Sequence, residues 1–212
     1  SSPPRNPPGT EQASIDAWAR PLKLAHELST QPAPPRAERP QYDGNRAGPG
    51  PGFDGVRVVS VYAPNGTALD SPRYSEKLAW YRRFRQWLDD AVPPTASLVL
   101  AGDFNVAPED RDVWDAEAWR GQLLFTEPEK AALRHLAGWG LTDLLRRHHP
   151  EETVYTWWDY RGGAFHRGWG LRIDHILASA SMTSRCTGVA VHRDERKGEK
   201  PSDHAPVMAS FD

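Results

Sequence analysis

Prolines are spread unevenly along the 212-residue chain, and their distribution limits which part can form a packed fold. Residues 1–52 hold eleven of the twenty prolines and end in a Pro-Gly run at 48–52. Such a composition buries too little apolar surface to offset the entropy lost on ordering the backbone. We therefore expect residues 1–53 to be a Pro/Gly-rich, largely disordered segment, and residues 54–212 to hold the folded domain. Apolar residues at roughly helical spacing in 14–29 fit either a short docking helix or a transient one.

From position 56 onward, strand-like and helix-like patterns alternate. The β-branched run 56–62 predicts a strand. Ser71 and Pro72 supply an N-cap and a proline at the first helical position, and the following helical spacing predicts a helix over 72–91. Thr126 and Glu129 form a capping box that predicts a further helix. Other expected elements are strands at 97–102, 153–158, 171–178, 186–192 and 205–211, a helical stretch at 141–149 and a loop at 106–121. This order predicts a layered α/β or α+β fold around a sheet.

Charge, cysteine content and hydropathy narrow the classes of function. The formal net charge of −2 means that any nucleic-acid contact must be made through a local patch. The single cysteine, Cys186, excludes an internal disulfide and favours a reducing compartment, so we expect a cytoplasmic protein. No run approaches 18 apolar residues and no signal-peptide pattern opens the chain, so we expect no contact with a membrane.

Polar side chains stand at the ends of several expected strands. The apolar run Leu98–Ala101 leads directly into Gly102-Asp103-Phe104-Asn105, which reads as a buried strand that ends in a turn. Binding and catalytic residues are commonly placed at such positions. The whole set comprises Tyr62 with Asn65, Asp103 with Asn105, Asp174, and Asp203 with His204.

The chemistry of these side chains is coherent. Carboxylates suit a hard divalent cation such as Mg²⁺, which takes oxygen ligands and keeps several waters. A histidine paired with an aspartate from another strand is oriented and stays basic. Tyrosine and asparagine supply neutral hydrogen-bond donors to phosphate oxygens. The set therefore suits hydrolysis of a phosphodiester, which needs an activated water, charge neutralisation and a leaving-group acid.

Each position also has a purely structural interpretation. Gly102–Asn105 fits a plain turn, because Asp and Asn favour turns. Asp174 fits an ion pair with Arg172, Tyr62 fits a core aromatic residue, and residues 202–204 fit a turn before a strand. Taken one at a time, the residues leave these alternatives open.

Five stretches together resemble the exonuclease III and apurinic/apyrimidinic endonuclease family, part of the endonuclease/exonuclease/phosphatase superfamily. They are 59–66 (VSVYAPNG), 100–108 (LAGDFNVAP), 155–161 (YTWWDYR), 170–179 (GLRIDHILAS) and 200–207 (KPSDHAPV), in the order in which the family carries them. The resemblance covers roughly 54–212, the C-terminal part of the family's domain. It implies a four-layer α/β sandwich with two central β-sheets.

The resemblance also implies an activity. Members of the family cleave double-stranded DNA on the 5′ side of abasic sites in base excision repair, often with 3′ exonuclease and 3′-phosphatase activity, and depend on Mg²⁺ or Mn²⁺. The implied partner is duplex DNA with abasic sites or 3′ ends, and we expect the protein to be a monomer.

The resemblance assigns roles to individual residues. The catalytic residues are expected to be Tyr62, Asp103, Asn105, Asp174 and His204. The metal ligands are expected to be Asp103, Asn105, Asp203 and His204. DNA contacts are expected from Asn65, Arg161, Trp157 and Trp169, although Trp157 suits the core equally well. In this scheme Asp103 handles the proton of the attacking water or leaving group, and His204 contacts the phosphate while Asp174 orients it.

Two motifs of the family are absent from the chain. One is a strand with a Trp-Asn-Val-Asn-like sequence, and the other is a Gln-Glu pair whose glutamate is the principal metal ligand. We therefore expect the N-terminal strands to be missing and residues 54–212 to form a partial domain, with residues 1–53 unlike the family. Two alternatives to an active nuclease stay open: a truncated remnant that is catalytically impaired or inactive, and another phosphodiesterase of the superfamily.

Overall fold

The computed structural model describes residues 55–212. Two expectations concern residues outside this range: the disordered segment 1–53 and the helix at 14–29. Within residues 55–212, no helix is long and apolar enough to cross a bilayer.

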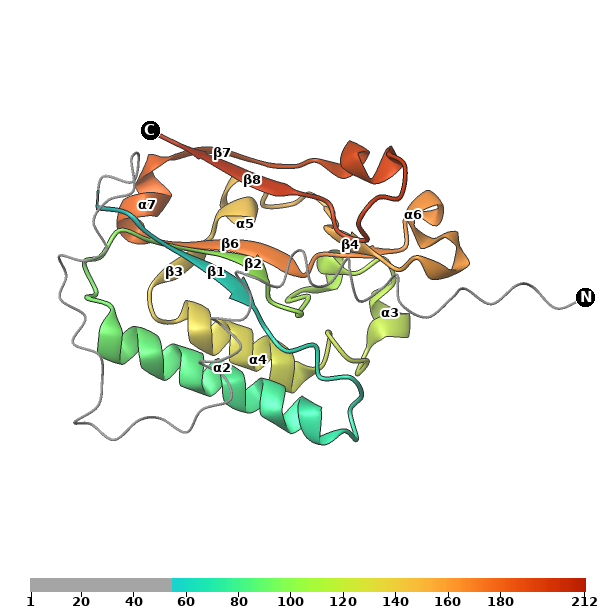
Figure 1. Ribbon diagram of the computed structural model, residues 1–212, viewed down its shortest axis with the longest axis horizontal. Coiled ribbons are helices and arrows are strands. Elements are labelled where there is room, and N and C mark those ends of the chain that lie inside the picture. The colour runs from blue at the N-terminus through green and yellow to red at the C-terminus, as the bar shows by residue number, and fades with distance from the viewer. Residues whose placement is uncertain (1–54) are drawn as a thin grey trace, which may run out of the picture. The chain divides into compact units, whose positions relative to one another are not determined.

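Strands and helices alternate through the described chain, as Figure 1 shows. The strands are β1 (Arg57–Tyr62), β2 (Leu98–Asp103), β3 (Leu141–Asp143), β4 (Trp157–Trp158), β5 (Gly170–Leu171), β6 (Asp174–Ser179), β7 (Cys186–Val191) and β8 (Val207–Phe211). The helices are α2 (Pro72–Ala91), α3 (Ala116–Trp119), α4 (Glu127–Ala137), α5 (Leu144–His148), α6 (Ala164–Arg167) and α7 (Ala180–Arg185). Short 3₁₀ turns lie at Asp110–Asp112, Arg161–Gly163 and Arg193–Lys197.

A four-stranded mixed sheet with the order β1-β2-β6-β3 forms the centre of the domain. β1 and β2 are parallel, whereas β6 runs antiparallel to both β2 and β3. The parallel pair is connected through α2, as parallel strands require a crossover. The sheet is thus of the α/β type that the sequence pattern predicts.

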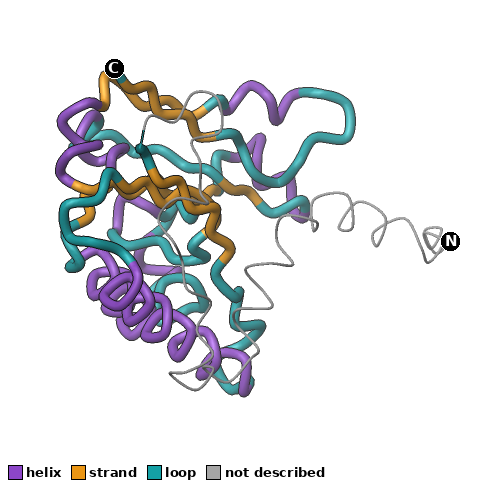
Figure 2. Tube along the Cα trace, turned by 60° about the vertical axis from the view of Figure 1, so that its left-hand side comes forward, coloured by secondary structure: helices purple, strands orange, loops and turns teal. Residues whose placement is uncertain are grey.

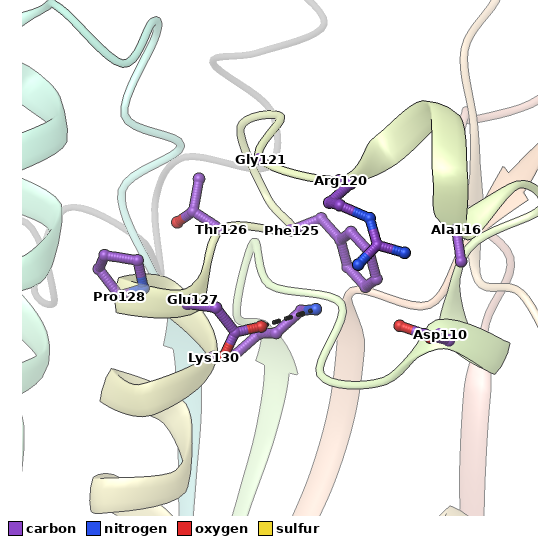
Figure 3. A pocket seen from close by; sticks show the side chains of 9 residues that line it. All are labelled: Asp110, Ala116, Arg120, Gly121, Phe125, Thr126, Glu127, Pro128 and Lys130. Carbon is purple, nitrogen blue, oxygen red and sulfur yellow. Dashed lines mark ion pairs between the residues drawn. The ribbon is translucent and has the colours of Figure 1, made fainter.

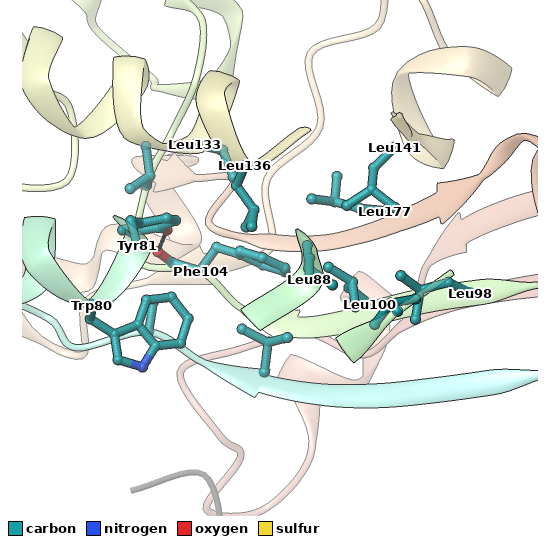
Figure 4. Packing of buried hydrophobic residues seen from close by; sticks show 14 residues of the cluster. Trp80, Tyr81, Leu88, Leu98, Leu100, Phe104, Leu133, Leu136, Leu141 and Leu177 are labelled. Carbon is teal, nitrogen blue, oxygen red and sulfur yellow. Dashed lines mark hydrogen bonds between the residues drawn. The ribbon is translucent and has the colours of Figure 1, made fainter. Parts of the chain in front are cut away.

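The long helices α2 and α4 cover one face of this sheet (Figure 1). Leu88 of α2 and Leu136 of α4 are fully buried against Leu98 and Leu100 of β2, as Figure 4 shows. In the same cluster the Tyr81 hydroxyl donates a hydrogen bond to the carbonyl of Phe104. The burial of these side chains fixes the helices against the strand that leads into Asp103.

The opposite face of the sheet packs against the β7-β8 hairpin, which lies above it in Figures 1 and 2. Val99 and Ile176 of the sheet share one apolar cluster with Val189 of β7, and Leu144 and Met182 fill the same cluster from α5 and α7. Two packed sheets with helices on the outer face of the larger one confirm the expected α/β class.

Several expected elements differ in detail. The helix at 72–91 is confirmed, and the capping box at Thr126 is present. The expected helix at 141–149 is wrong in its first turn, because residues 141–143 pair with β6 and become β3 before α5 begins. The expected strand at 153–158 is reduced to Trp157–Trp158, and the stretch 171–178 is divided between β5 and β6. The expected loop at 106–121 contains α3 and a 3₁₀ turn.

Candidate active site

Strand register brings three of the expected site residues side by side. Tyr62 pairs with Asp103 across β1 and β2, and Asp103 pairs with Asp174 across β2 and β6. The close approach of β1 depends on Gly102, since a Cβ added at this position would lie 2.0 Å from the carbonyl oxygen of Val61. Gly102 also has φ +146°, a conformation that L side chains rarely adopt. The turn motif is therefore a close-packed strand end rather than a surface turn.

Asn105 holds both carboxylate oxygens of Asp103. Its backbone N–H donates to Oδ1 at 2.8 Å, and its side-chain Nδ2 donates to Oδ2 at 3.0 Å. Nδ2 also donates to the carbonyl of Ala63 at 2.9 Å, and the side-chain oxygen of Asn105 accepts from Asn65 at 3.1 Å. The amide of Asn105 is therefore fully engaged within the protein, and it fixes the orientation of the Asp103 carboxylate.

The environment of Asp103 disfavours its charged form. Burial raises the pKa of Asp103 to about 7, and the negative charge of Asp174 acts in the same direction. The positive charges of His204 and Lys77 and the N–H of Asn105 oppose this rise in the pKa. A carboxylate with a pKa near neutrality can both accept and return a proton at physiological pH.

His204 pairs with Asp174, as expected. His204 Nδ1 lies 2.8 Å from Asp174 Oδ2, although the two residues are thirty positions apart. Burial lowers the pKa of His204, but the hydrogen bond and charge of Asp174, with the charges of Asp103 and Asp203, outweigh burial and raise the pKa to about 9. The imidazole is therefore a cation at neutral pH, and Nδ1 donates to the carboxylate.

Asp203 and Tyr62 complete the group of expected residues. Asp203 Oδ2 accepts a hydrogen bond from the indole N–H of Trp157 at 2.9 Å. The Tyr62 side chain is 48% exposed, which rules out the core interpretation. Partial burial raises the pKa of Tyr62, and the charges of Asp103 and Asp203 add to the rise, so its hydroxyl stays protonated and can donate a hydrogen bond.

The alternative pairing of Asp174 with Arg172 is wrong. The buried Arg172 guanidinium pairs with Asp112 at 2.7 and 3.1 Å and with Asp143 at 2.7 Å. Arg172 also contacts His175, which faces away from the site and is only 1% exposed. This separate network satisfies Arg172 and leaves Asp174 available for His204.

The residues expected to contact DNA occupy different environments. Arg161 has a side chain that is 90% exposed and pairs with Asp159 at 2.6 Å. A cavity of about 430 Å³ lies between Trp157 and Arg161 on one side and residues of the 118–124 segment on the other. Trp169 stacks on Trp114, with ring centroids 4.9 Å apart.

Two supporting residues were not predicted from the sequence. Thr156 is fully buried, and its Oγ1 accepts hydrogen bonds from the backbone N–H groups of Ile173 and Asp174, each at 3.1 Å. Its carbonyl accepts from the N–H of Ala205, so Thr156 ties the start of β6, which carries Asp174, to the segment that carries His204. Lys77 is fully buried and donates to the carbonyls of Asn65 and Asn105. The only sequence signal for Lys77 is a lysine among the apolar positions of an amphipathic helix.

The described residues contain no group of three or more carboxylate, histidine or cysteine side chains arranged to hold a metal ion. Mg²⁺ often binds through only one or two carboxylates, together with waters and substrate phosphates. Asp103 and Asp203 offer oxygen donors of this kind at the exposed end of the sheet.

A second cavity, of about 470 Å³, lies away from this cluster at the start of α4 (Figure 3). Its charged residues are largely paired with acidic neighbours. Lys130 bonds to Glu127 at 3.2 Å and sits over the ring of Phe125, and Arg120 pairs with Glu117 at 2.9 Å. Asp110, which also lines this cavity, is a single carboxylate, so the cavity offers no cluster of charged groups comparable with that around Asp103.

Known proteins resemble this chain in sequence and in fold. A family model described as the Endonuclease/Exonuclease/phosphatase family matches residues 12–204. The Exodeoxyribonuclease III of Haemophilus influenzae is 33% identical over 167 residues, covering 75% of this chain and 62% of that protein. Two solved structures have a TM-score of 0.73 and cover 75% of this chain and 62% of their own. One is the 3′ phosphatase NExo from Neisseria bound to a product DNA hairpin, 46% identical, and the other is an AP endonuclease from Archaeoglobus fulgidus, 39% identical. The chain thus spans 62% of the length of each of these relatives.

Proposed function

This chain belongs to the endonuclease/exonuclease/phosphatase family, and from this membership we propose that it hydrolyses phosphodiester bonds of DNA in repair, at abasic sites and at 3′ ends. The family expected from the five sequence stretches is thereby confirmed. The names of the relatives support the proposed substrate: they include an exodeoxyribonuclease III, an AP endonuclease and a 3′ phosphatase bound to a DNA hairpin.

One observation carries the proposal: the Asp103 carboxylate, held by Asn105, lies beside the Asp174–His204 pair at neighbouring strand ends. With a pKa of about 7, Asp103 can take the proton of an attacking water. The Asp174 pair engages Nδ1 of His204 and leaves Nε2–H of the cationic ring to donate to a phosphate oxygen. The protonated hydroxyl of Tyr62 would donate to the same phosphate.

We further propose that a divalent cation, Mg²⁺ or Mn²⁺, binds at this end of the sheet. The expected ligands Asp103, Asn105, Asp203 and His204 differ in their availability. The carboxylates of Asp103 and Asp203 accept hydrogen bonds but keep further lone pairs for a cation, whereas both atoms of the Asn105 amide are engaged and Nδ1 of His204 carries a proton. A bound cation would neutralise charge on the phosphate. We assign the ligand role first to the two aspartates.

The DNA would lie across the exposed end of the sheet and the 157–161 turn. The cavity between Trp157 and Arg161 is apolar on the Trp side and carries an exposed guanidinium at its rim, which suits a sugar and its phosphate. Asn65 binds Asn105 through its side chain, so we assign it to orienting the site as well as to a DNA contact. Trp169 offers an aromatic ring for stacking, together with Trp114.

Cleavage of three substrates tests this proposal: a duplex with one abasic site, a duplex with a recessed 3′ end, and a small phosphodiester. Each is incubated with Mg²⁺, with Mn²⁺ and with EDTA. A DNA repair nuclease would cleave the two duplexes with either metal and would not cleave them in EDTA. Cleavage of the small ester alone would identify another phosphodiesterase of the superfamily, and silence on all three would identify an inactive remnant.

A further inference from the structure

Lys77 is a fully buried cation near the candidate site. It lies on the face of α2 that covers the sheet and is 0% exposed. Its ammonium donates to the carbonyl of Asn105 at 2.7 Å and to the carbonyl of Asn65 at 3.1 Å, and its third partner is Oε1 of Glu129. Three hydrogen-bond donors therefore meet three acceptors, two of which belong to the loops that follow β1 and β2.

Glu129 anchors this ammonium from α4. It is 0% exposed and belongs to the capping box of α4, where it accepts from the N–H of Thr126 at 3.0 Å and from the N–H of Leu124 at 3.1 Å. Burial lowers the pKa of Lys77, but the charge and hydrogen bond of Glu129 and the charge of Asp103 oppose this effect. Glu129 therefore has two roles: it caps the start of α4 and it fixes the position of the Lys77 ammonium.

The two carbonyls that Lys77 binds belong to backbone that needs support. Asn105 has φ +51°, in the left-handed region that is uncommon for residues other than glycine. A non-glycine residue held there is strained, and the surroundings must offset that strain. Gly66, at φ +97°, makes room for the stem of Lys77, because a Cβ there would lie 3.3 Å from Lys77 Cδ.

A buried ion pair alone is weak evidence for a contribution to stability, because an apolar pair of similar volume often serves as well. A pair that only joined α2 to α4 would need no contact with the loops. Lys77 instead directs two of its donors at the backbone of Asn65 and Asn105, whose side chains bond to each other at 3.1 Å. Asn105 in turn holds both oxygens of Asp103.

We propose that Lys77 is a positioning residue for the candidate site: its ammonium, anchored by Glu129, holds the carbonyls of Asn65 and Asn105 so that the Asn105 amide holds the Asp103 carboxylate. This inference rests on the proposed nuclease function for its catalytic consequence, but not for its structural one. Misplacing a catalytic group by about 1 Å costs roughly 100-fold in rate. Loss of the ammonium should therefore lower kcat far more than it raises KM.

Three variants separate positioning from simple stabilisation. Lys77→Met removes the donors and keeps the length of the side chain. Lys77→Met combined with Glu129→Gln removes both charges, so no buried carboxylate is left unpaired and we expect the protein to fold. Lys130→Met is the matched control, because Lys130 is also largely buried and paired with a glutamate (Figure 3), but its bonds do not reach the site.

Two measurements are made on each variant: kcat and KM on an abasic duplex with Mg²⁺, and the side-chain amide NMR signals of Asn65 and Asn105 in EDTA. We expect both Lys77 variants to shift these signals and to lower kcat about 100-fold, with KM changed no more than about threefold. Neutralising Glu129 should restore the unfolding temperature but not kcat. Lys130→Met should leave the signals and kcat unchanged.

The proposal is overturned if the Asn65 and Asn105 signals stay in place in the double variant, or if kcat recovers together with stability. Failure of the nuclease assignment looks different. In that case the wild-type protein cleaves no DNA, whereas the NMR signals, which need neither metal nor substrate, still decide whether Lys77 positions the two asparagines.

Discussion

His204 Nδ1 lies 2.8 Å from Asp174 Oδ2, and this bond joins the segment that leads into β8 to the first residue of β6. The two strands belong to different sheets. The pair therefore connects the two sheets at the end where Asp103 lies, and it sets the charge that the site presents to a phosphate. Its electrostatics can be tested without a substrate.

Asp174→Asn should lower the pKa of His204 from about 9 by roughly 1–3 units, because an adjacent opposite charge shifts a pKa by that amount. NMR titration of the imidazole C–H signals measures this. His149 serves as an internal control, since its pKa is raised by the hydrogen bond that its ring donates to Glu152 and should not move in the variant. An unchanged His204 pKa would mean that another group holds its proton.

The same pair predicts a dependence of stability on pH. The pKa of His204 is higher in the folded state than its ordinary 6.5, so the folded state binds the proton more tightly. The contribution of the protonated His204 to the free energy of unfolding is fully present below about pH 6.5 and is lost as the pH rises through about 9. The free energies of unfolding of wild type and Asp174→Asn should differ most near pH 6 and converge by pH 10.

Asp103 predicts a further loss of stability with rising pH, in a lower pH range than that of His204. Its pKa is about 7 in the folded state and 3.8 ordinarily, so the folded state binds more protons and loses stability as the pH rises from about 4 to about 7. Asp103→Asn removes this penalty. The variant should match wild type near pH 4 and be more stable by roughly 1–3 kcal/mol at pH 8.

Urea denaturation in EDTA at these two pH values measures the effect of Asp103→Asn, because no cation then screens the carboxylate. If Asp103→Asn raised the free energy of unfolding equally at both pH values, the increase would arise from packing rather than from charge. No gain at pH 8 would contradict the raised pKa of Asp103.

Gly102→Ala tests the close approach of β1 and β2. The added Cβ would lie 2.0 Å from the Val61 carbonyl and force a positive φ on alanine, so we expect a loss of about 3 kcal/mol or more in the free energy of unfolding. Gly188→Ala is the matched control, since nothing lies within 4 Å of its added Cβ, and it should change stability by no more than about 0.5 kcal/mol. Equal effects of the two substitutions would refute the close contact.

Local sequence signals predicted the elements that depend on local chemistry. Ser71 and Pro72 mark the start of α2, and Thr126 with Glu129 marks the start of α4. The sequence did not predict β3 because its three residues are too few to show a hydrophobic periodicity. Only their pairing with β6 makes them a strand. The predicted strand at 153–158 is too long because only Trp157 and Trp158 pair with β5.

For the candidate site, the sequence predicted which residue types stand at strand ends, and the family resemblance predicted the pair of Asp174 with His204, but the other contacts were not predicted. The pairing register of β2 and β6 places Asp103 opposite Asp174, and this register depends on how the whole strands pack. The contact of Lys77 with Asn105 could not be predicted, because it depends on how α2 sits on the sheet. The roles of Asp203 and Arg161 in binding metal and DNA stay predictions, as do a monomeric state and a cytoplasmic location.

The central claim is that the Asp103 carboxylate drives hydrolysis of DNA, and the single-turnover cleavage rate of an abasic duplex in Mg²⁺ tests it most directly. We expect Asp103→Ala to reduce the rate about 100- to 10,000-fold, the range typical of a general base. Asp89→Ala, which removes a carboxylate on α2 that pairs only with Arg85, should leave the rate unchanged. Equal traces of cleavage by wild type and Asp103→Ala would contradict the claim.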